Sequence, residues 1–220
     1  MSTRVVLIRH GQPLNHCEGE PERMSGWTDF PLSDEGRRQA ASLARRLEAE
    51  RARFTALYAS PLQRAADTAR AIAGRCDANI ELVDDLREIG CGCVDGMPIP
   101  EVQRDYADCW HANLLQNDED FRWPGGESYR ELRERCLRSL CTLAARHAGH
   151  RIALVTHAGV ISQVIGHMNG LTPARWECFR PGHCSVTEVE WAGRSGRLLT
   201  FDDRVHLQGI ESEDHRLDSA

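Results

Sequence analysis

The sequence predicts an α/β protein, a three-layer α/β/α sandwich with a mainly parallel sheet. Three observations lead to this prediction. Short apolar runs typical of buried strands alternate along the chain with segments of helical periodicity. No internal repeat or linker interrupts this alternation over the 220 residues. Near the end of the chain, two segments of alternating polarity follow each other closely and predict a hairpin.

The first part of the chain predicts three strands and two helices. Ser33 is a typical N-cap residue, and the apolar spacing after it indicates an amphipathic helix. Pro61 is well suited to start the second helix, because its missing N–H is not needed there. In chain order, we expect a strand at 5–8, an irregular stretch at 11–32, a helix to about Arg51, a strand at 54–60, a helix from Pro61 and a short strand at 80–83.

The second part begins with a loop-rich insert at 90–126, which has room for one or two short helices. A helix with apolar spacing from Tyr129 should end near Gly149, since glycine often follows a helix. The remaining elements are expected as a strand at 151–157, a helix at 159–168, and a hairpin of 185–191 and 197–202 joined through 192–196. We expect one domain over residues 1–207 and a polar tail over 208–220.

Composition excludes several classes of function. No run approaches the roughly 18 apolar residues of a membrane span, and no secretory signal is recognisable, so we expect a cytoplasmic protein. The net charge of −6 argues against binding nucleic acid or a membrane surface. The nine cysteines form no C-x-x-C pair, so neither a zinc ribbon nor a thioredoxin motif is indicated, and we expect reduced, mostly buried thiols.

All 27 basic residues are arginine. A GC-rich genome accounts for much of this bias, but its chemical consequence holds regardless of the cause. The absence of lysine excludes a P-loop lysine, a protein-kinase lysine and Schiff-base chemistry. A phosphate or carboxylate bound through a cationic side chain must therefore be held by arginine, whose planar fork suits such anions, or by histidine.

Potential phosphate ligands follow several of the predicted strands. Arg9 and His10 end the first strand, Arg64 lies in the first turn after Pro61, and His157 ends the strand at 151–157. Glu88 comes just after the third strand. A single histidine at a strand end is more often structural than catalytic. Ligands bind beyond the carboxyl ends of strands in such sheets, however, so the combination predicts a phosphate site.

Six motifs in this order resemble the histidine phosphatase superfamily, also called the phosphoglycerate mutase-like fold. The resemblance covers roughly residues 4–207 and points to the phosphatase branch, including the group similar to α-ribazole phosphatase. The motifs are "RHG" at 9–11, "SGWTDFPLSDEG" at 25–36, "ASPLQRAADTA" at 59–69, "LREI" at 86–89, "PGGES" at 124–128 and "VTHAGV" at 155–160.

The resemblance implies a catalytic role for each of the five residues. His10 would be the nucleophile that forms a phosphohistidine, and the cations near it should lower its pKa and keep it neutral. Arg9, Arg64 and His157 would hold the phosphoryl oxygens, as phosphoryl transfer requires. Glu88 would protonate the leaving alkoxide and then activate water. No metal and no cofactor is implied.

The resemblance also implies further contacts to the substrate, through motifs that are less specific. Asn15 and Ser25, with the backbones of Gly26 and Ala158, match positions that touch phosphate in relatives, although a structural role in the loops is the alternative. His183 precedes a strand that relatives place near the site, so it is a candidate for lining the substrate pocket.

The chain departs from the family pattern after the acid. In "EIGCGCVDG", Cys91 replaces an aromatic residue, Val94 a tryptophan and Asp95 a glutamate. The wall beside Glu88 should therefore be smaller than in relatives, and their substrate preference is not carried over. Cys91 and Cys93 are either small apolar fillers or residues that make the site oxidisable.

We expect a phosphatase of small phosphomonoesters rather than a mutase. The cofactor-dependent mutases carry a longer insert with more cations and an Asn where this chain has Gly159, whereas the insert here contains only Arg104 and Arg122. The alternatives are a phosphoglycerate mutase-type transferase, a phosphate-binding module without turnover, and a phosphohistidine protein phosphatase. The expected partner is a small phosphorylated metabolite, and the chain could form a homodimer.

Overall fold

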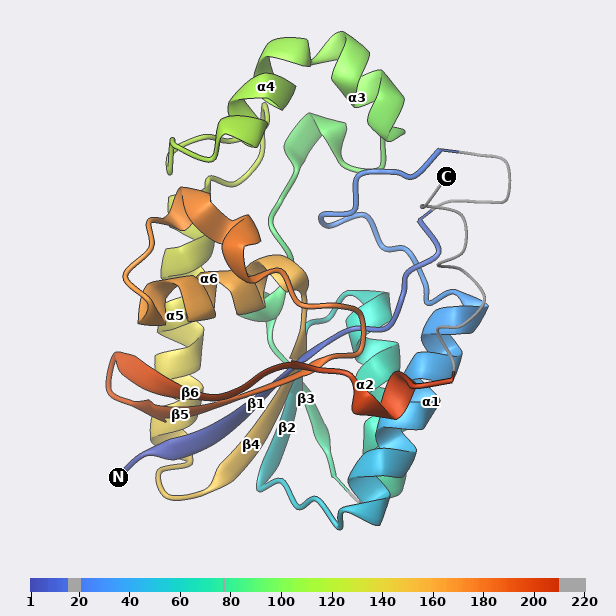
Figure 1. Ribbon diagram of the computed structural model, residues 1–220, viewed down its shortest axis with the longest axis vertical. Coiled ribbons are helices and arrows are strands. Elements are labelled where there is room, and N and C mark those ends of the chain that lie inside the picture. Colours follow the sequence, from blue (N-terminus) through green and yellow to red (C-terminus); the bar gives the residue numbers. More distant parts are fainter. Residues whose placement is uncertain (16–20, 77, 210–220) are drawn as a thin grey trace.

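A computed structural model describes residues 1–15, 21–76 and 78–209 (Figure 1). Its strands are β1 (Thr3–Arg9), β2 (Ala56–Ala59), β3 (Ile80–Leu82), β4 (Arg151–Thr156), β5 (Val186–Ala192) and β6 (Ser195–Asp203). They form a six-stranded sheet in the order β3-β2-β4-β1-β5-β6. The first four are parallel, and β5 runs antiparallel to both β1 and β6. The predicted mainly parallel sheet is confirmed, with the expected hairpin at one edge.

Helices cover both faces of the sheet (Figure 1). Helices α1 (Asp34–Ala49) and α2 (Gln63–Cys76) lie on one face, and α5 (Tyr129–Arg146) and α6 (Ala158–Met168) lie on the other. Strand β1 shows why both faces must be covered. Val6 and Ile8 pack with the side chains of α1 and α2, whereas Val5 and Leu7 pack with those of α5 and α6. Successive strand residues point to opposite faces, so the apolar run of β1 contributes to two cores.

Side-chain caps define where the helices begin. The Ser33 hydroxyl accepts a hydrogen bond from the Gly36 N–H at 3.0 Å and so caps α1, as expected. Helix α2 begins at Gln63, two residues later than Pro61. The Leu62 carbonyl accepts the first helical hydrogen bonds, and the Asp29 carboxylate accepts the Gln63 N–H at 2.6 Å. A carboxylate 34 residues upstream therefore fixes this boundary, which local sequence could not indicate.

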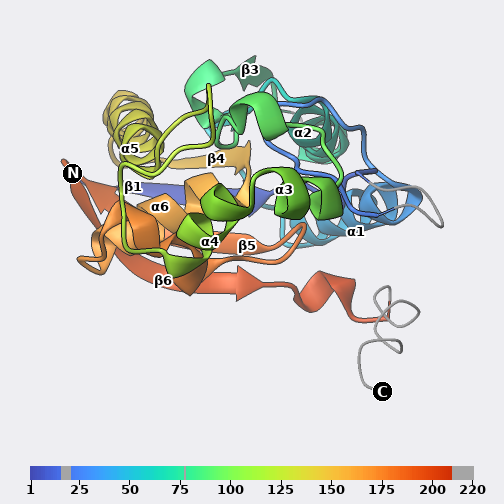
Figure 2. The ribbon, with the colours of Figure 1, turned by 90° about the horizontal axis from the view of Figure 1, so that it is seen from above.

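The insert at 90–126 forms a cap above the carboxyl ends of the central strands (Figures 1 and 2). We expected one or two short helices here, and the insert contains two, α3 (Ile99–Asp105) and α4 (Ala107–Leu115), after a 3-10 turn at Gly92–Val94. An aromatic cluster holds the cap to the loop that returns from it. The Trp123 ring centroid lies 6.5 Å from that of Trp110 and 5.5 Å from that of Phe121.

Several elements differ in detail from the expectation. A 3-10 segment at Pro173–Phe179 precedes β5, in a stretch to which the sequence pattern assigned no element. Only Gly193 and Arg194 separate β5 from β6, so the hairpin turn is tighter than the five-residue joint that we expected. No helix among the described residues is long and apolar enough to cross a membrane. Most of the predicted tail, residues 210–220, lies outside the described part, so the domain division remains a prediction.

Candidate active site

The carboxyl ends of β1 and β4 bring two histidines together. The backbone N–H of His10 donates to the Thr156 carbonyl at 2.9 Å. This bond joins the two strand ends immediately beside His157. The ring centroids of His10 and His157 lie 4.9 Å apart. Arg9 precedes His10 on β1, and Arg64 lies in the first turn of α2, the helix that follows the neighbouring strand β2. The residues predicted from the strand ends are thus gathered at one edge of the sheet, as the parallel topology requires.

His10 is held in one tautomer. Its Nδ1 lies 2.7 Å from the Gly11 carbonyl oxygen, and a carbonyl can only accept a hydrogen bond. The proton is therefore on Nδ1, and Nε2 keeps its lone pair. The side chain is only 4% exposed. Burial lowers the His10 pKa well below its usual value, and the neighbouring His157, Arg64 and Arg9 lower it further. Burial is thus the largest cause of the low pKa, and the neighbouring groups that we expected to lower it act in the same direction.

Arg64 is a fully buried cation with no carboxylate paired to it among the described residues. Its Nη1 and Nη2 donate to the carbonyls of Thr28 at 3.1 Å and Gly26 at 2.7 Å. Burial lowers its pKa, although Glu88 and Asp29 act in the opposite direction. Neutral carbonyls accept these hydrogen bonds without forming a direct ion pair, so the site is suited to bind an anion.

Arg9 is fixed by the segment that leads into β5. Its Nη1 donates to the Pro181 carbonyl at 2.7 Å, and its Nη2 lies 2.8 Å from Nε2 of His183. A guanidinium can only donate, so His183 must accept through an unprotonated Nε2 and is neutral. Burial, followed by the charge of Arg9, lowers the His183 pKa well below its usual value. Burial, followed by Arg180, lowers the Arg9 pKa to about 10.

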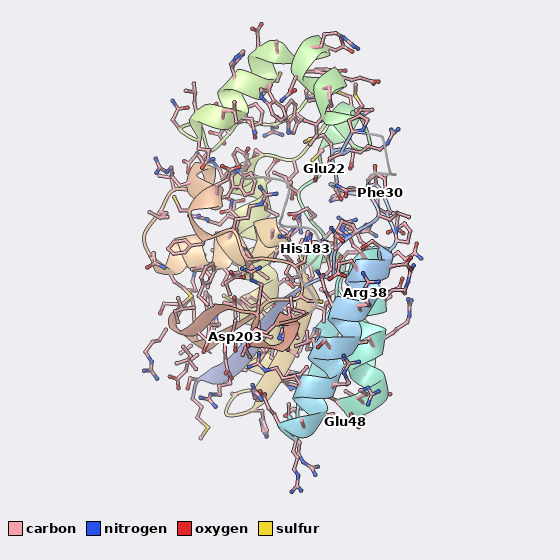
Figure 3. All side chains as sticks on the ribbon, turned by 45° about the vertical axis from the view of Figure 1, so that its right-hand side comes forward. Glu22, Phe30, Arg38, Glu48, His183 and Asp203 are labelled. Atoms are coloured by element: carbon pink, nitrogen blue, oxygen red, sulfur yellow. The ribbon has the colours of Figure 1, made fainter. Side chains whose placement is uncertain are left out.

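His183 lies beside His10, and its expected place in the substrate pocket stays a prediction. Its ring centroid is 5.7 Å from that of His10. Figure 3 shows His183 between the sheet and the cap of α3 and α4. Its direct partner in this structure is Arg9, however, so orienting that guanidinium is the role its contacts show.

His157 completes the cluster at the start of α6. Its Nε2 lies 2.8 Å from the Ser60 hydroxyl, and burial lowers its pKa well below the usual value, with Arg64 as the next cause. Ala158 is the first residue of α6, so its N–H is among those that a helix leaves without an intrahelical acceptor. Such N–H groups at a helix N-terminus favour a bound anion.

Three polar atoms of this cluster are buried and have no hydrogen-bond partner among the described residues. They are Nε of Arg9, Nε of Arg64 and Nδ1 of His157. Buried polar atoms are normally paired, and a tetrahedral oxyanion supplies several acceptors at once. The two arginines also create a positive potential in the site. The arrangement therefore fits a phosphoryl group next to the lone pair of His10.

Glu88 lies on the other side of the α6 N-terminus. Its Oε2 accepts the Gly159 N–H at 3.1 Å, and its Oε1 accepts the Ile89 N–H at 2.9 Å. The indole Nε1 of Trp27 donates to the Glu88 carbonyl at 2.7 Å and fixes the backbone. A 3-10 turn at Asp84–Leu86 separates Glu88 from β3, so it does not follow the strand as directly as expected. The carboxyl group is nevertheless held at the site, where it can give or take a proton.

Asp95 has a role that sequence reasoning missed. Its carboxylate accepts the backbone N–H groups of Gly26 at 3.0 Å, Trp27 at 2.5 Å and Thr28 at 3.2 Å. The carbonyls of Gly26 and Thr28 in turn hold Arg64. Asp95 thus positions Arg64 through the loop. The only signal in the sequence was an acidic residue where relatives carry glutamate.

The residues predicted from the less specific motifs, Asn15, Ser25 and Gly26, lie in different surroundings. The Asn15 amide donates to Glu22 at 3.0 Å and to the Arg23 carbonyl at 3.2 Å, so its contacts show the alternative role in loop structure. The Gly26 N–H is committed to Asp95. Ser25 is half-buried directly before this loop. Contacts of these three residues with phosphate remain predictions.

The wall beside Glu88 is formed by small side chains. Cys91 is only 4% exposed, and a Cβ built on Gly26 would lie 2.8 Å from its Sγ. Burial raises the Cys91 pKa far above its usual value, with Asp95 and Glu88 acting in the same direction. Cys93 is exposed. The contacts of Cys91 are those of a small apolar filler.

Comparison with known proteins identifies the family. The model of the histidine phosphatase superfamily (branch 1) matches residues 5–204. A phosphoglycerate mutase-like protein 4 from Arabidopsis thaliana is 36% identical over 159 residues, 71% of this chain and 67% of the relative. A metal-independent phosphoserine phosphatase from the same plant is 34% identical over 210 residues, 94% of this chain and 84% of the relative.

A solved structure supports the fold independently. The crystal structure of a putative alpha-ribazole-5'-P phosphatase from Escherichia coli superposes with a TM-score of 0.80 at 23% sequence identity. The match covers 93% of this chain and 98% of the other. The expected fold is confirmed by this likeness.

Proposed function

This chain belongs to the histidine phosphatase superfamily, branch 1, and we propose that it hydrolyses small phosphomonoesters through a phosphohistidine on His10. The observation that supports this most directly is the state of His10. Its imidazole is buried and neutral, and Nε2 keeps a lone pair beside three cationic or polar side chains suited to phosphate. That combination is what a nucleophile for phosphorus needs.

In the first step, the Nε2 lone pair of His10 attacks phosphorus. The N–P bond forms while the P–O bond to the alcohol breaks, and Glu88 gives its proton to the departing alkoxide oxygen. Arg9, Arg64 and His157 stabilise the three remaining phosphoryl oxygens as charge shifts between them. The Nδ1–H of His10 donates to Gly11 throughout and stabilises the positive charge on the phosphorylated ring.

In the second step, water replaces the alcohol. The Glu88 carboxylate takes a proton from water, and the water oxygen attacks the phosphohistidine. The N–P bond breaks, and its electron pair returns to Nε2. Inorganic phosphate then leaves, and both Glu88 and His10 have regained their starting states.

Relatives of this chain carry both phosphatase and mutase names, so the choice rests on this chain's residues. The cap is short. Its Arg104 forms an ion pair with Asp105 at 2.7 Å, so its charge is already engaged within the cap. A binding module without turnover would keep the arginines but would not need Glu88 at the α6 N-terminus. A small phosphorylated metabolite therefore remains our proposed partner, and a cytoplasmic location and a homodimer remain proposals.

The test is phosphate release from a panel of phosphomonoesters in excess EDTA, with His10→Ala as the blank. The panel contains phosphoserine, α-ribazole phosphate, phosphoglycolate, phosphoglycerates, sugar phosphates and a phosphopeptide. We expect release from a small metabolite that survives EDTA and disappears in the variant. A phosphopeptide turned over far faster than any metabolite would favour a protein phosphatase. No release from any ester would contradict the proposal and leave the mutase or binding-module alternatives.

A further inference from the structure

Arg180 is an exposed cation for which the proposed reaction has no use. It follows the 3-10 segment Pro173–Phe179, and its guanidinium carbon lies 5.8 Å from the centroid of the Trp176 ring. Such a contact orients a cation without neutralising it. Among the described residues, no carboxylate forms an ion pair with Arg180 and no hydrogen bond engages its side chain.

This cation lies next to the catalytic arginine. Pro181, the residue that follows it, accepts a hydrogen bond from Arg9 at 2.7 Å, and His183 accepts another at 2.8 Å. The charge of Arg180 lowers the pKa of both Arg9 and His183, which places its guanidinium within electrostatic reach of the two. The segment 180–183 therefore holds Arg9 through two acceptors, Pro181 and His183, and carries one exposed cation beside them.

The phosphoryl group does not require Arg180. It is matched by the unpartnered buried atoms of Arg9, Arg64 and His157. In contrast, Arg180 is exposed, so it is available to the part of a substrate that projects from the buried cluster toward solvent. In a phosphomonoester, that part is the leaving group.

We propose that Arg180 binds a second anionic group on the leaving moiety, so that the preferred substrates are phosphomonoesters that also carry a carboxylate or a further phosphate. This inference rests on the proposed function and specifies its substrate class. Arginine suits either anion, because its planar fork donates two parallel hydrogen bonds to a pair of oxygens. The stacked indole of Trp176 reduces the rotational freedom that the side chain loses on binding.

Matched pairs of esters test this subsite. 3-Phosphoglycerate and glycerol 3-phosphate differ by a carboxylate in place of a hydroxymethyl group, and fructose 1,6-bisphosphate and fructose 6-phosphate differ by a second phosphate. For each pair, the ratio of kcat/KM is measured in the wild type and in Arg180→Gln. We expect the ratio of at least one pair to fall about fivefold, the effect of one partly exposed ion pair. The pair that responds identifies the anion.

Two further variants separate charge recognition from structural damage. Arg180→Lys keeps the charge and should retain most of the preference. Arg175→Gln removes an exposed arginine from the same segment that is not among the main causes of the Arg9 and His183 pKa shifts, and it should leave the ratios unchanged. An equal loss for both members of each pair in Arg180→Gln would overturn the inference, as would unchanged ratios in that variant.

The proposed function can fail separately. If the wild type hydrolyses none of these esters, calorimetric binding of the same pairs decides between the two claims. Binding that favours the more anionic member in the wild type, and loses that preference in Arg180→Gln, supports the subsite and contradicts only the phosphatase. Binding without such a preference contradicts the subsite as well.

Discussion

The backbone of Gly159 and the carboxyl group of Glu88 occupy adjoining space at the start of α6. The Gly159 N–H donates to Oε2 of Glu88 at 3.1 Å, and a Cβ built on Gly159 would lie 2.2 Å from Oε1. Any other residue at position 159 must therefore displace the carboxyl group. Gly159 was singled out in the sequence because mutases carry Asn there, and the structure gives this difference a physical consequence.

Gly159→Ala should therefore lower kcat, because the proposed acid is pushed from its hydrogen bond. General acid–base catalysis contributes about 10²–10⁴-fold, and we expect the variant to lose about tenfold to a hundredfold of kcat. Steady-state kinetics on the best ester measures it. Gly74→Ala is the matched control, because a Cβ there meets nothing within 4 Å. Equal activity of both variants would show that the carboxyl position does not matter.

Asp95→Asn should weaken substrate binding, since Arg64 is held by the loop that Asp95 anchors. Replacing the carboxylate removes charge-assisted hydrogen bonds to three N–H groups. We expect the free energy of unfolding to fall by about 2 kcal/mol and KM to rise several-fold. Denaturant unfolding and steady-state kinetics measure the two effects, and Asp95→Glu should restore part of both. Asp108, an exposed acid on α4, provides the neutral control as Asp108→Asn. An unchanged KM in Asp95→Asn would mean that the loop keeps its shape without this anchor.

The buried histidines predict lower stability in acid. The pKa values of His10, His157 and His183 all lie well below the usual 6.5 in the folded protein, mainly because of burial. Below about pH 6.5, the unfolded chain takes up protons that the folded chain does not. The contribution of these histidines to the free energy of unfolding is therefore fully present above that pH. It is lost as pH falls toward the folded pKa values, by up to about 1.4 kcal/mol per pH unit for each histidine.

Denaturant unfolding at a series of pH values from about 7.5 to 5 measures this loss. His183→Asn removes one of the three groups and should make the slope shallower. A stability that does not change below about pH 6.5, or an identical slope in the variant, would contradict the buried neutral state of these rings.

The cysteines beside the site should not regulate it. Because burial raises its pKa, the Cys91 thiol should react slowly, whereas Cys93 and Cys178 are exposed. Mass spectrometry after brief treatment with a thiol reagent should find Cys93 and Cys178 labelled before Cys91. Peroxide should leave phosphatase activity unchanged. Loss of activity that a thiol reductant restores would instead support the oxidisable site.

Much of the fold could be predicted because its signals are local. An apolar run predicts strand β1, and a capping serine followed by amphipathic spacing predicts helix α1. The strand ends of a parallel sheet lie at one edge, so the meeting of His10 with His157 followed from topology alone. Glu88 was selected from its position just after the third strand, and the family motifs gave it a role. Its actual place depends on a 3-10 turn that has no strong sequence pattern.

The parts that could not be predicted depend on contacts between distant residues. The start of α2 is set by Asp29, and the loop that holds Arg64 is set by Asp95. His183 was expected as a pocket residue, but its hydrogen bond to Arg9 comes from the packing of one loop against β1. Arg180 had no sequence signal among 27 arginines, because only its neighbours in space distinguish it.

The most direct test of the central claim is the phosphoenzyme itself. The wild type and His10→Ala are mixed with a ³²P-labelled ester that the wild type hydrolyses, quenched within a fraction of the turnover time, and digested for peptide mapping. We predict an acid-labile, base-stable label on the peptide that contains His10, and none in the variant. A phosphatase that turns over normally without this label, or a label that persists in His10→Ala, would contradict the account.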